Sequence, residues 1–190
     1  ISMGPEKAAD VIRNGIALGG DEGIHLKNQE KVDAIATAKA LTKVLSEGSY
    51  DLILSGKTAV DDGYGAVPQM IAQNLGFPHI TSVKKLEING TNILAEKEFD
   101  GGTAKIESPI PCVITCEKGL NEPRYASLME VMKAKKKELK VIDVAGLGVA
   151  EVSTPKIKIE KLSYPPERPA GKVLSGDMAD QVKEIIGVLR

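Results

Sequence analysis

A short apolar run, residues 51–55 (Asp-Leu-Ile-Leu-Ser), constrains the fold most because of what stands on either side of it. Residues 31–47 before it carry apolar side chains at helical spacing. After it, a glycine-rich segment leads into a second helical pattern that ends at Gly76. An apolar run of this length is typical of a strand buried in a parallel sheet, and residues 111–116 form another. Strands that alternate with helices at this spacing predict an α/β fold with a parallel sheet covered by helices.

Residues 86–107 have a different pattern. Residues 86–88 and 93–95 flank Asn89-Gly-Thr-Asn92, a sequence that favours a tight hairpin turn. Residues 103–107 then alternate between polar and apolar side chains, as in a strand with one face exposed to solvent. We therefore expect an antiparallel hairpin insertion in the parallel sheet.

The start of the chain belongs to a predicted core, residues 1–144. Residues 1–5 (Ile-Ser-Met-Gly-Pro) read as the end of a strand that turns into a helix, with Pro5 at the first helical position. Apolar residues at helical spacing continue to Ile16. No complete strand precedes this helix, so the core is expected to lack its first strand.

The end of the chain, residues 145–190, is predicted to be an extended arm. Proline and glycine interrupt it, and only residues 156–162 alternate. A helix is expected at residues 177–189, with Ser175 as its cap. An extended segment with a terminal helix cannot bury its own apolar side chains, so we expect the arm to lie on a partner.

Composition argues against several function classes. The 190 residues carry a net charge of −1, whereas a general binder of nucleic acid or anionic membranes needs a strong basic excess. No apolar run approaches the roughly 20 residues that span a bilayer, and no signal peptide is visible, so we expect a cytoplasmic protein without membrane insertion.

The only histidines are His25 and His79. Cys112 and Cys116 are expected to be buried thiols about 13 Å apart on one strand, too far for a disulfide or a shared metal. We therefore expect neither a metal nor an acid–base or nucleophilic catalytic group.

The glycine-rich segment after residues 51–55, Gly56 to Gln69, is the best candidate for a functional loop. It follows a buried strand and opens a helix, the place where open α/β sheets bind ligands and where free N–H groups favour an anion. Gly63 and Gly65 would let a ligand approach the backbone. The segment matches neither the Walker loop nor the dinucleotide fingerprint. Spacing alone leaves nucleotide binding and a plain tight turn open.

A second candidate lies between residues 120 and 140. The lysine-rich run 133–140 is either a solvated helix end or a docking patch for an acidic partner. Leu128, Val131 and Met132 stand at helical spacing, which is typical of a core stripe but also of an apolar knob that enters a partner.

Several motifs together resemble the β subunit of electron-transfer flavoproteins. Three of them follow one another in the family's order and spacing: Asp100-Gly-Gly, Leu120-Asn-Glu-Pro-Arg-Tyr125 and Met132-Lys-Ala-Lys-Lys-Lys137. Two more, Gly76-Phe-Pro78 before them and Leu147-Gly-Val149 after them, also stand where the family has them. The similarity covers essentially all of the chain, although the family's proteins are longer at the N terminus. The resemblance implies a three-layer, Rossmann-like fold of the adenine-nucleotide-hydrolase-like type, with a hairpin insertion and an extended C-terminal arm.

The resemblance also implies a set of sites. The family's small subunit binds a structural AMP, and the matching positions here are Met3, Gly56, Lys57, Thr58, Ala59, Val60, Asp61, Asp62, Gly63, Tyr64, Gly65, Ala66 and Val67. The family's recognition loop for a client flavin dehydrogenase matches Arg124, Tyr125, Ala126, Ser127, Leu128, Met129, Glu130, Val131, Met132 and Lys133. Within it Leu128 matches the anchor. Glu98 matches a residue that steadies the flavin domain of the partner α subunit, and residues 145–190 match the arm that wraps that subunit.

The resemblance further implies a heterodimer in which FAD lies in the α subunit and this chain is an electron carrier, not an enzyme. It would lie in the cytoplasm, or in the mitochondrial matrix of a eukaryote. Tyr64-Gly-Ala-Val67 stands where many relatives have polar residues near the phosphate, so backbone N–H groups would have to hold it. Two alternatives stay open: an electron-bifurcating version with FAD in place of AMP, and an ATP-binding domain of the universal-stress type.

Overall fold

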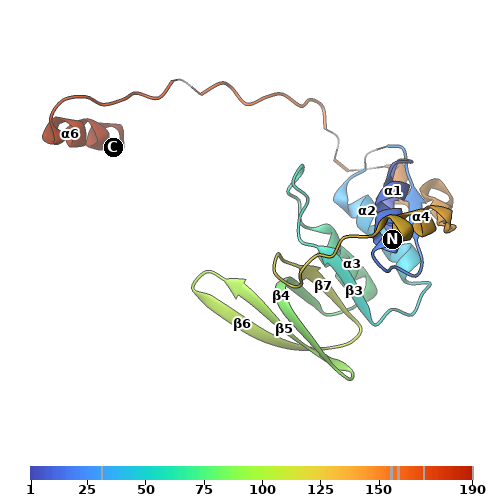
Figure 1. Cartoon of the computed structure of the whole chain (residues 1–190). Coiled ribbons are helices and arrows are strands. Elements are labelled where there is room, and N and C mark those ends of the chain that lie inside the picture. Colours follow the sequence, from blue (N-terminus) through green and yellow to red (C-terminus); the bar gives the residue numbers. More distant parts are fainter. Residues whose placement is uncertain (31, 155, 158, 169, 190) are drawn as a thin grey trace. The chain divides into compact units, whose positions relative to one another are not determined.

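A computed structural model (Figure 1) describes residues 1–190 except 31, 155, 158, 169 and 190. Its internal contacts separate two compact units, residues 1–158 and residues 159–190. The first unit is built from parallel and mixed sheets with helices packed on them, so the predicted α/β class is confirmed.

The strands of the first unit form two sheets. The smaller sheet has the order β1-β2-β8 and is parallel throughout. Its strands are β1 (Ser2–Gly4), β2 (Ile24–Lys27) and β8 (Lys140–Asp143). The larger sheet has the order β3-β7-β4-β5-β6. Its strands are β3 (Leu52–Gly56), β4 (His79–Asn89), β5 (Asn92–Phe99), β6 (Gly102–Pro109) and β7 (Cys112–Cys116).

Strand β4 connects the parallel and antiparallel parts of the larger sheet. Its first half pairs in parallel with β7, and its second half pairs antiparallel with β5 across the predicted turn. The register shifts around Ser82, which has a φ of 57° and whose N–H donates to Thr115 Oγ1 at 2.8 Å. The hairpin insertion is confirmed, but β4 begins at His79, well before the predicted residues 86–88. The bulge breaks the alternation there, so Ile80 and Val83 both enter the core three positions apart.

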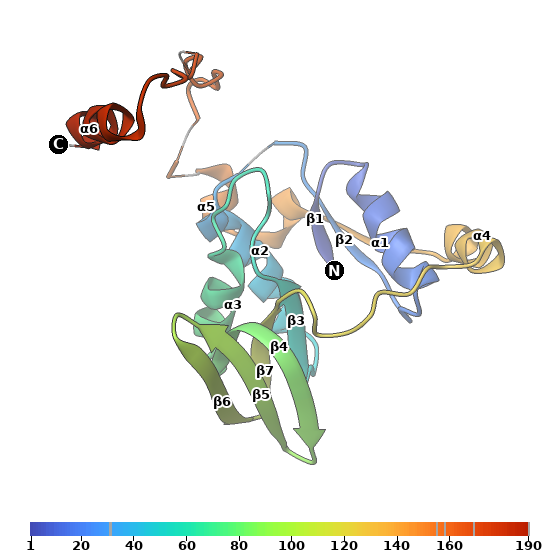
Figure 2. The same cartoon turned by 60° about the vertical axis from the view of Figure 1, so that its left-hand side comes forward.

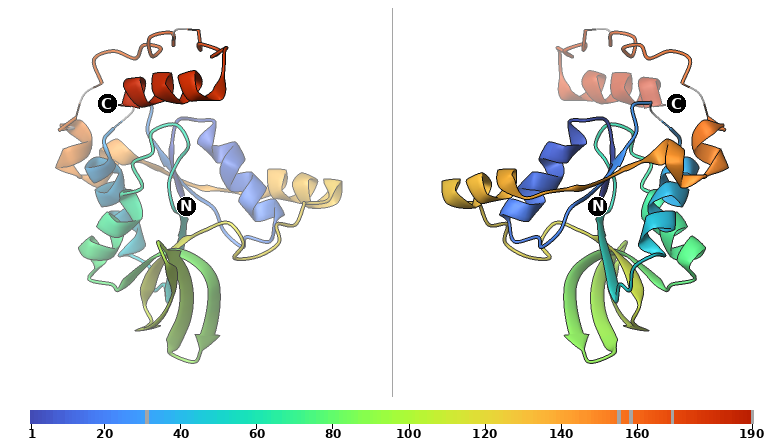
Figure 3. Two further views of the ribbon diagram at one scale, coloured as in Figure 1. Left: turned by 90° about the vertical axis from the view of Figure 1, so that its left-hand side faces the viewer. Right: turned by 90° about the vertical axis from the view of Figure 1, so that its right-hand side faces the viewer.

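Helices cover the sheets in two layers. Figure 3 shows α2 (Ala34–Leu45) and α3 (Val67–Leu75) on one side of the strands, and α1 (Ala8–Ala17) and α4 (Leu128–Lys136) on the other. This gives the three-layer arrangement expected from the resemblance.

The helix starts differ in detail from prediction. Helix α1 begins three residues after Pro5, because residues 5–7 form a turn in which the N–H of Ala8 donates to the Pro5 carbonyl. Helix α2 begins at Ala34, where Asp33 caps it by accepting the N–H of Ala36 at 2.9 Å. The predicted start at Lys31 lies outside the described residues.

Residues 144–154 belong to the first unit. A 3₁₀ helix, η1 (Val144–Leu147), and α5 (Ala150–Ser153) lie against α2, and Val144 is buried with Leu26. The predicted division of the chain at residue 144 remains a prediction.

The second unit ends in α6 (Met178–Leu189), as predicted. Its cap is Asp177, which accepts the N–H of Asp180 at 2.9 Å, rather than Ser175. No described residue of α6 is buried. The apolar residues recur at i, i+3, i+4 and i+7, and are Val182, Ile185, Ile186 and Leu189. The predicted alternating stretch at 156–162 forms no strand in its described residues.

Strands β1 and β3 are edges, each hydrogen-bonded to one neighbour among the described residues. Residues 52–56 are parallel to β7 as expected, but Leu54 is 54% exposed, so this strand is not covered as a central one would be. The prediction of a fully buried strand is therefore wrong for β3. The local pattern does not reveal which neighbours a strand has.

Candidate functional site

The predicted nucleotide loop, Gly56 to Val67, runs from the last residue of β3 to the first residue of α3, and residues 57–66 project beyond the end of β3 in Figure 2. Gly63 and Gly65 have φ values of 64° and 54°, a conformation that favours glycine. A Cβ at Gly65 would stand 3.2 Å from the Lys57 carbonyl oxygen, while one at Gly63 would meet no atom within 4 Å. The N–H of Tyr64 donates to Asp62 Oδ1 at 3.1 Å, which uses that N–H inside the loop. Residues 57–64 of the loop are exposed, and Gly65 and Ala66 are half-buried.

The start of α3 offers polar groups for a ligand. Its N-cap Ala66 has no side-chain oxygen to accept a helix N–H, and the structure shows no side-chain cap there. Gln69, in the first turn, has a buried Oε1 with no hydrogen-bond partner among the described residues. Uncapped N–H groups at a helix start favour an anion, and an amide can turn to present its donor or its acceptor. Gln69 was not among the predicted contacts, although its position in the first turn is a signal that points to it.

Met3 lies on β1, in the smaller sheet, and its side chain packs against the core around Leu26. The loop follows β3, in the larger sheet. The two parts of the predicted AMP site therefore come from different sheets.

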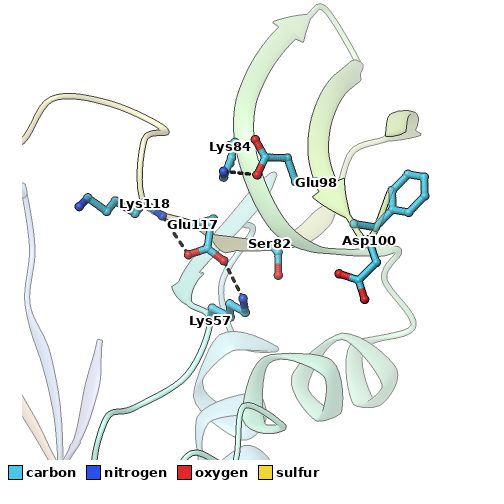
Figure 4. A pocket seen from close by; sticks show the side chains of 8 residues that line it. Lys57, Ser82, Lys84, Glu98, Asp100, Glu117 and Lys118 are labelled. Atoms are coloured by element: carbon cyan, nitrogen blue, oxygen red, sulfur yellow. Dashed lines mark hydrogen bonds and ion pairs between the residues drawn. The ribbon is translucent and has the colours of Figure 1, made fainter. Parts of the chain in front are cut away.

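A charged cavity of about 400 Å³ opens at the ends of β3 and β7 (Figure 4). Its lining residues are Lys57, Ser82, Lys84, Glu98, Phe99, Asp100, Glu117 and Lys118. Two ion pairs cross it: Lys57 Nζ lies 2.7 Å from Glu117 Oε2, and Lys84 pairs with Glu98. The hydrogen bond from Lys57 and the backbone N–H of Lys118 hold the pKa of Glu117 below its usual range.

This cavity joins residues that the resemblance places in different sites. Lys57 was expected at the nucleotide and Glu98 at the partner's flavin domain, yet both line one cavity. Glu117 and Lys118 were not predicted. They directly follow β7, and residues just beyond the carboxyl ends of parallel strands commonly form sites.

Helix α4 has two unlike faces. The stripe of Leu128, Val131 and Met132 is split between them: Val131 packs on α1, whereas Leu128 is 80% exposed and Met132 52%. We call the exposed set the α4 outer face. It consists of Leu128, Met129 and Met132 of the helix together with Tyr125 in the segment before it.

The remaining predicted recognition residues support the helix or flank it. Ser127 and Glu130 form a capping box, in which each side chain accepts the other's backbone N–H, and this lowers the pKa of Glu130. Ala126 is partly buried against the α1–α4 core, and Lys133 is exposed in the last turns of α4. The side chain of Arg124 donates to the carbonyl of Leu18 in its own chain.

The two thiols differ in burial, although both were expected to be buried. Cys112 is buried and Cys116 is half-buried, and burial raises the pKa of both. Among the described residues there is no cluster of side chains suited to a metal ion, and no helix is long and apolar enough to cross a bilayer.

Comparison with known proteins identifies the family. The family model described as "Electron transfer flavoprotein domain" matches residues 1–147. The electron transfer flavoprotein subunit beta of Bacillus subtilis is 37% identical over 194 residues, covering 100% of this chain and 76% of the relative. The chain belongs to the electron transfer flavoprotein family. Beta subunits from Bradyrhizobium diazoefficiens (38% identity, 100% and 76% coverage) and Homo sapiens (36%, 97% and 74%) are similarly close.

The resemblance to electron transfer flavoprotein β subunits is thereby confirmed over the whole chain. As a β subunit of that family, the chain functions in electron transport, and a flavin is part of the chemistry of the complex. The universal-stress alternative is not the family that matches.

Proposed function

We propose that this chain pairs with a larger, FAD-carrying α subunit, binds AMP, and helps to pass electrons between a flavin dehydrogenase and an acceptor. The observation that carries the proposal is the α4 outer face, in which Leu128 stands exposed on a helix whose other face is packed. A leucine with 80% of its surface exposed beside Met129 and Tyr125 is suited to entering a pocket on another protein.

AMP would sit between the Gly56–Val67 loop and the edge of the smaller sheet that carries Met3. Three features fit this ligand: the uncapped start of α3, the unpartnered Oε1 of Gln69, and the glycine conformation at Gly65. The backbone N–H groups at the start of α3 would hold the phosphate, because Tyr64-Gly-Ala-Val67 offers it few polar side chains.

The electrons themselves would be carried by FAD in the α subunit, and the residues of this chain would serve as its support. Glu98, on the rim of the charged cavity, would contact the α subunit's mobile flavin domain. It is 60% exposed and paired with Lys84, so it can exchange that partner for a cation of the α subunit at little cost. The residues of this chain would have no catalytic role of their own.

The C-terminal arm would lie on the α subunit. The apolar stripe of α6 supports this, because none of its described residues is buried in this chain. We expect residues 1–144 to form the core of this chain and residues 145–190 to form the arm.

The cofactor content of the purified heterodimer tests this proposal. The chain is co-purified with the α subunit of the same organism, and released nucleotides are quantified by chromatography. One FAD and one AMP per heterodimer are expected. Two FAD without AMP would replace the AMP assignment by the bifurcating version, and failure to form a heterodimer would overturn the proposal.

A further inference from the structure

Helix α4 is held at both ends by the C terminus of α1. Before α4, Arg124 Nη2 donates to the carbonyl of Leu18, and after it Lys137 Nζ lies 3.4 Å from the carbonyl of Gly20. The last carbonyls of a helix lack partners within the helix and carry its negative end, so both cations lie where a helix favours them.

Gly19, between these two carbonyls, leaves room for the contact with Arg124. Its φ is 115°, which favours glycine, and a Cβ there would stand 2.7 Å from Arg124 Nη2. That distance is shorter than a Cβ tolerates. Any larger residue at position 19 must therefore shift the end of the Arg124 side chain and take up a backbone conformation that it resists, and both changes disturb the contact with Leu18.

The inner face of α4 rests on the same helix. Ala134 is buried and Val131 partly buried against Ile12 and Ile16 of α1. The capping box at Ser127 fixes the first turn of α4. Together with the contacts of Arg124 and Lys137 at its two ends, this packing fixes the orientation of α4 on α1. The direction in which the α4 outer face points is fixed as a result.

We propose that Arg124 is a positioning residue that acts on docking through α4, and that Gly19 and the carbonyl of Leu18 form its seat. This inference rests on the proposed function, in which the α4 outer face docks on a flavin dehydrogenase. It changes the expected role of Arg124, which the resemblance placed among the contacts to that partner. A loop already ordered before docking loses less conformational entropy on binding, so the contact raises affinity without touching the partner.

The test uses the complete α–β complex and a flavin dehydrogenase chosen because it reduces the wild-type complex. Arg124→Ala should raise the KM for the complex about three- to tenfold, the cost of ordering one or two side chains, while kcat stays within about twofold. Hydrogen exchange should become faster at residues 126–131, whose amides report the order of the first turn of α4. Arg124→Lys, which keeps a cation in reach of the carbonyl, should recover part of both effects.

A glycine pair separates positioning from direct contact. Gly19→Ala keeps the arginine in the sequence but crowds the position that its guanidinium occupies beside Leu18. It should therefore reproduce both the rise in KM and the faster hydrogen exchange. Gly76→Ala is the matched control: Gly76 also ends a helix with a positive φ, 70°, but a Cβ there would meet no atom within 4 Å. It should cost stability without changing the KM.

The outcomes distinguish the inference from the function on which it rests. If Leu128→Ala leaves the KM unchanged, the docking function fails. If Leu128→Ala raises the KM and Gly19→Ala does not, or if Arg124→Ala raises it with hydrogen exchange unchanged, Arg124 touches the partner directly and the positioning role is wrong.

Discussion

Lys57 Nζ lies 2.7 Å from Glu117 Oε2, and this contact joins the first residue after β3 to the first residue after β7. It connects the proposed nucleotide loop to the charged cavity. The hydrogen bond from Lys57 is the largest cause of the lowered pKa of Glu117, and the charge of Lys84 is the smallest.

Lys57→Met should therefore raise the pKa of Glu117 toward its ordinary value of 4.5, and Lys84→Met should raise it less. A lowered pKa in the folded state stabilises the fold above pH 4.5, and that stabilisation is lost as the pH falls through the lowered value. Carboxyl titration followed by NMR measures the shift. Equal shifts in the two variants would show that general charge, rather than this contact, sets the pKa.

Leu128→Ala should slow electron transfer with a client dehydrogenase and leave the melting temperature near that of the wild type. Truncation of a docking anchor costs about 2 kcal/mol or more of binding free energy, which corresponds to roughly 30-fold in affinity. A core leucine would instead cost about 2–5 kcal/mol of stability. Ile88→Ala is the control, because Ile88 is 61% exposed near the tip of the β4–β5 hairpin, away from α4. Loss of folding in Leu128→Ala, or equal kinetics in both variants, contradicts the docking role.

Gly65→Val should lower the AMP content of the purified complex, and Gly65→Ala should lower it less. Both demand a positive φ from a residue that resists it, and both place a Cβ 3.2 Å from the Lys57 carbonyl. Gly63→Ala has the same backbone penalty at a φ of 64° but an open space for its Cβ, so it should retain more AMP. Nucleotide content is measured by chromatography of the denatured complex. Full retention in Gly65→Val would remove this loop from the AMP site.

Ile186→Asp should weaken the association with the α subunit by about tenfold or more, because it places a charge in the apolar stripe of α6. Gly187→Asp introduces the same charge one residue later, about 100° around the helix and outside the apolar stripe, and should leave association unchanged. Sedimentation of equimolar mixtures measures the dissociation constants. Equal dissociation constants for both variants would mean that α6 lies elsewhere.

Local patterns predict much of this molecule because local chemistry decides it. The turn at Asn89 to Asn92 needs a residue that accepts a positive φ, and Gly90, whose φ is 62°, is visible in the sequence. Helix α4 and the terminal helix α6 follow from the spacing of their apolar residues. In each case the interactions that select the structure lie within a few positions along the chain.

What the sequence did not reveal depends on distant pairings. No local signal shows that Lys57 and Glu98 line one cavity, since 41 positions separate them and the sheet order brings them together. The seat of Arg124 at Leu18 is likewise a long-range contact. The half-buried stripe on α4 shows the same limit, because spacing alone cannot tell which of two faces meets α1.

The open edges of β1 and β3 have a consequence for handling the protein. An uncovered parallel edge presents a row of backbone donors and acceptors to any extended segment nearby, including one from a second copy of the chain. Copies of residues 1–190 purified alone would then aggregate by adding strands to one another, through backbone groups rather than through the exposed side chains of α4 or α6. Such aggregates would grow with concentration, and neither Leu128→Ala nor Ile186→Asp would prevent them.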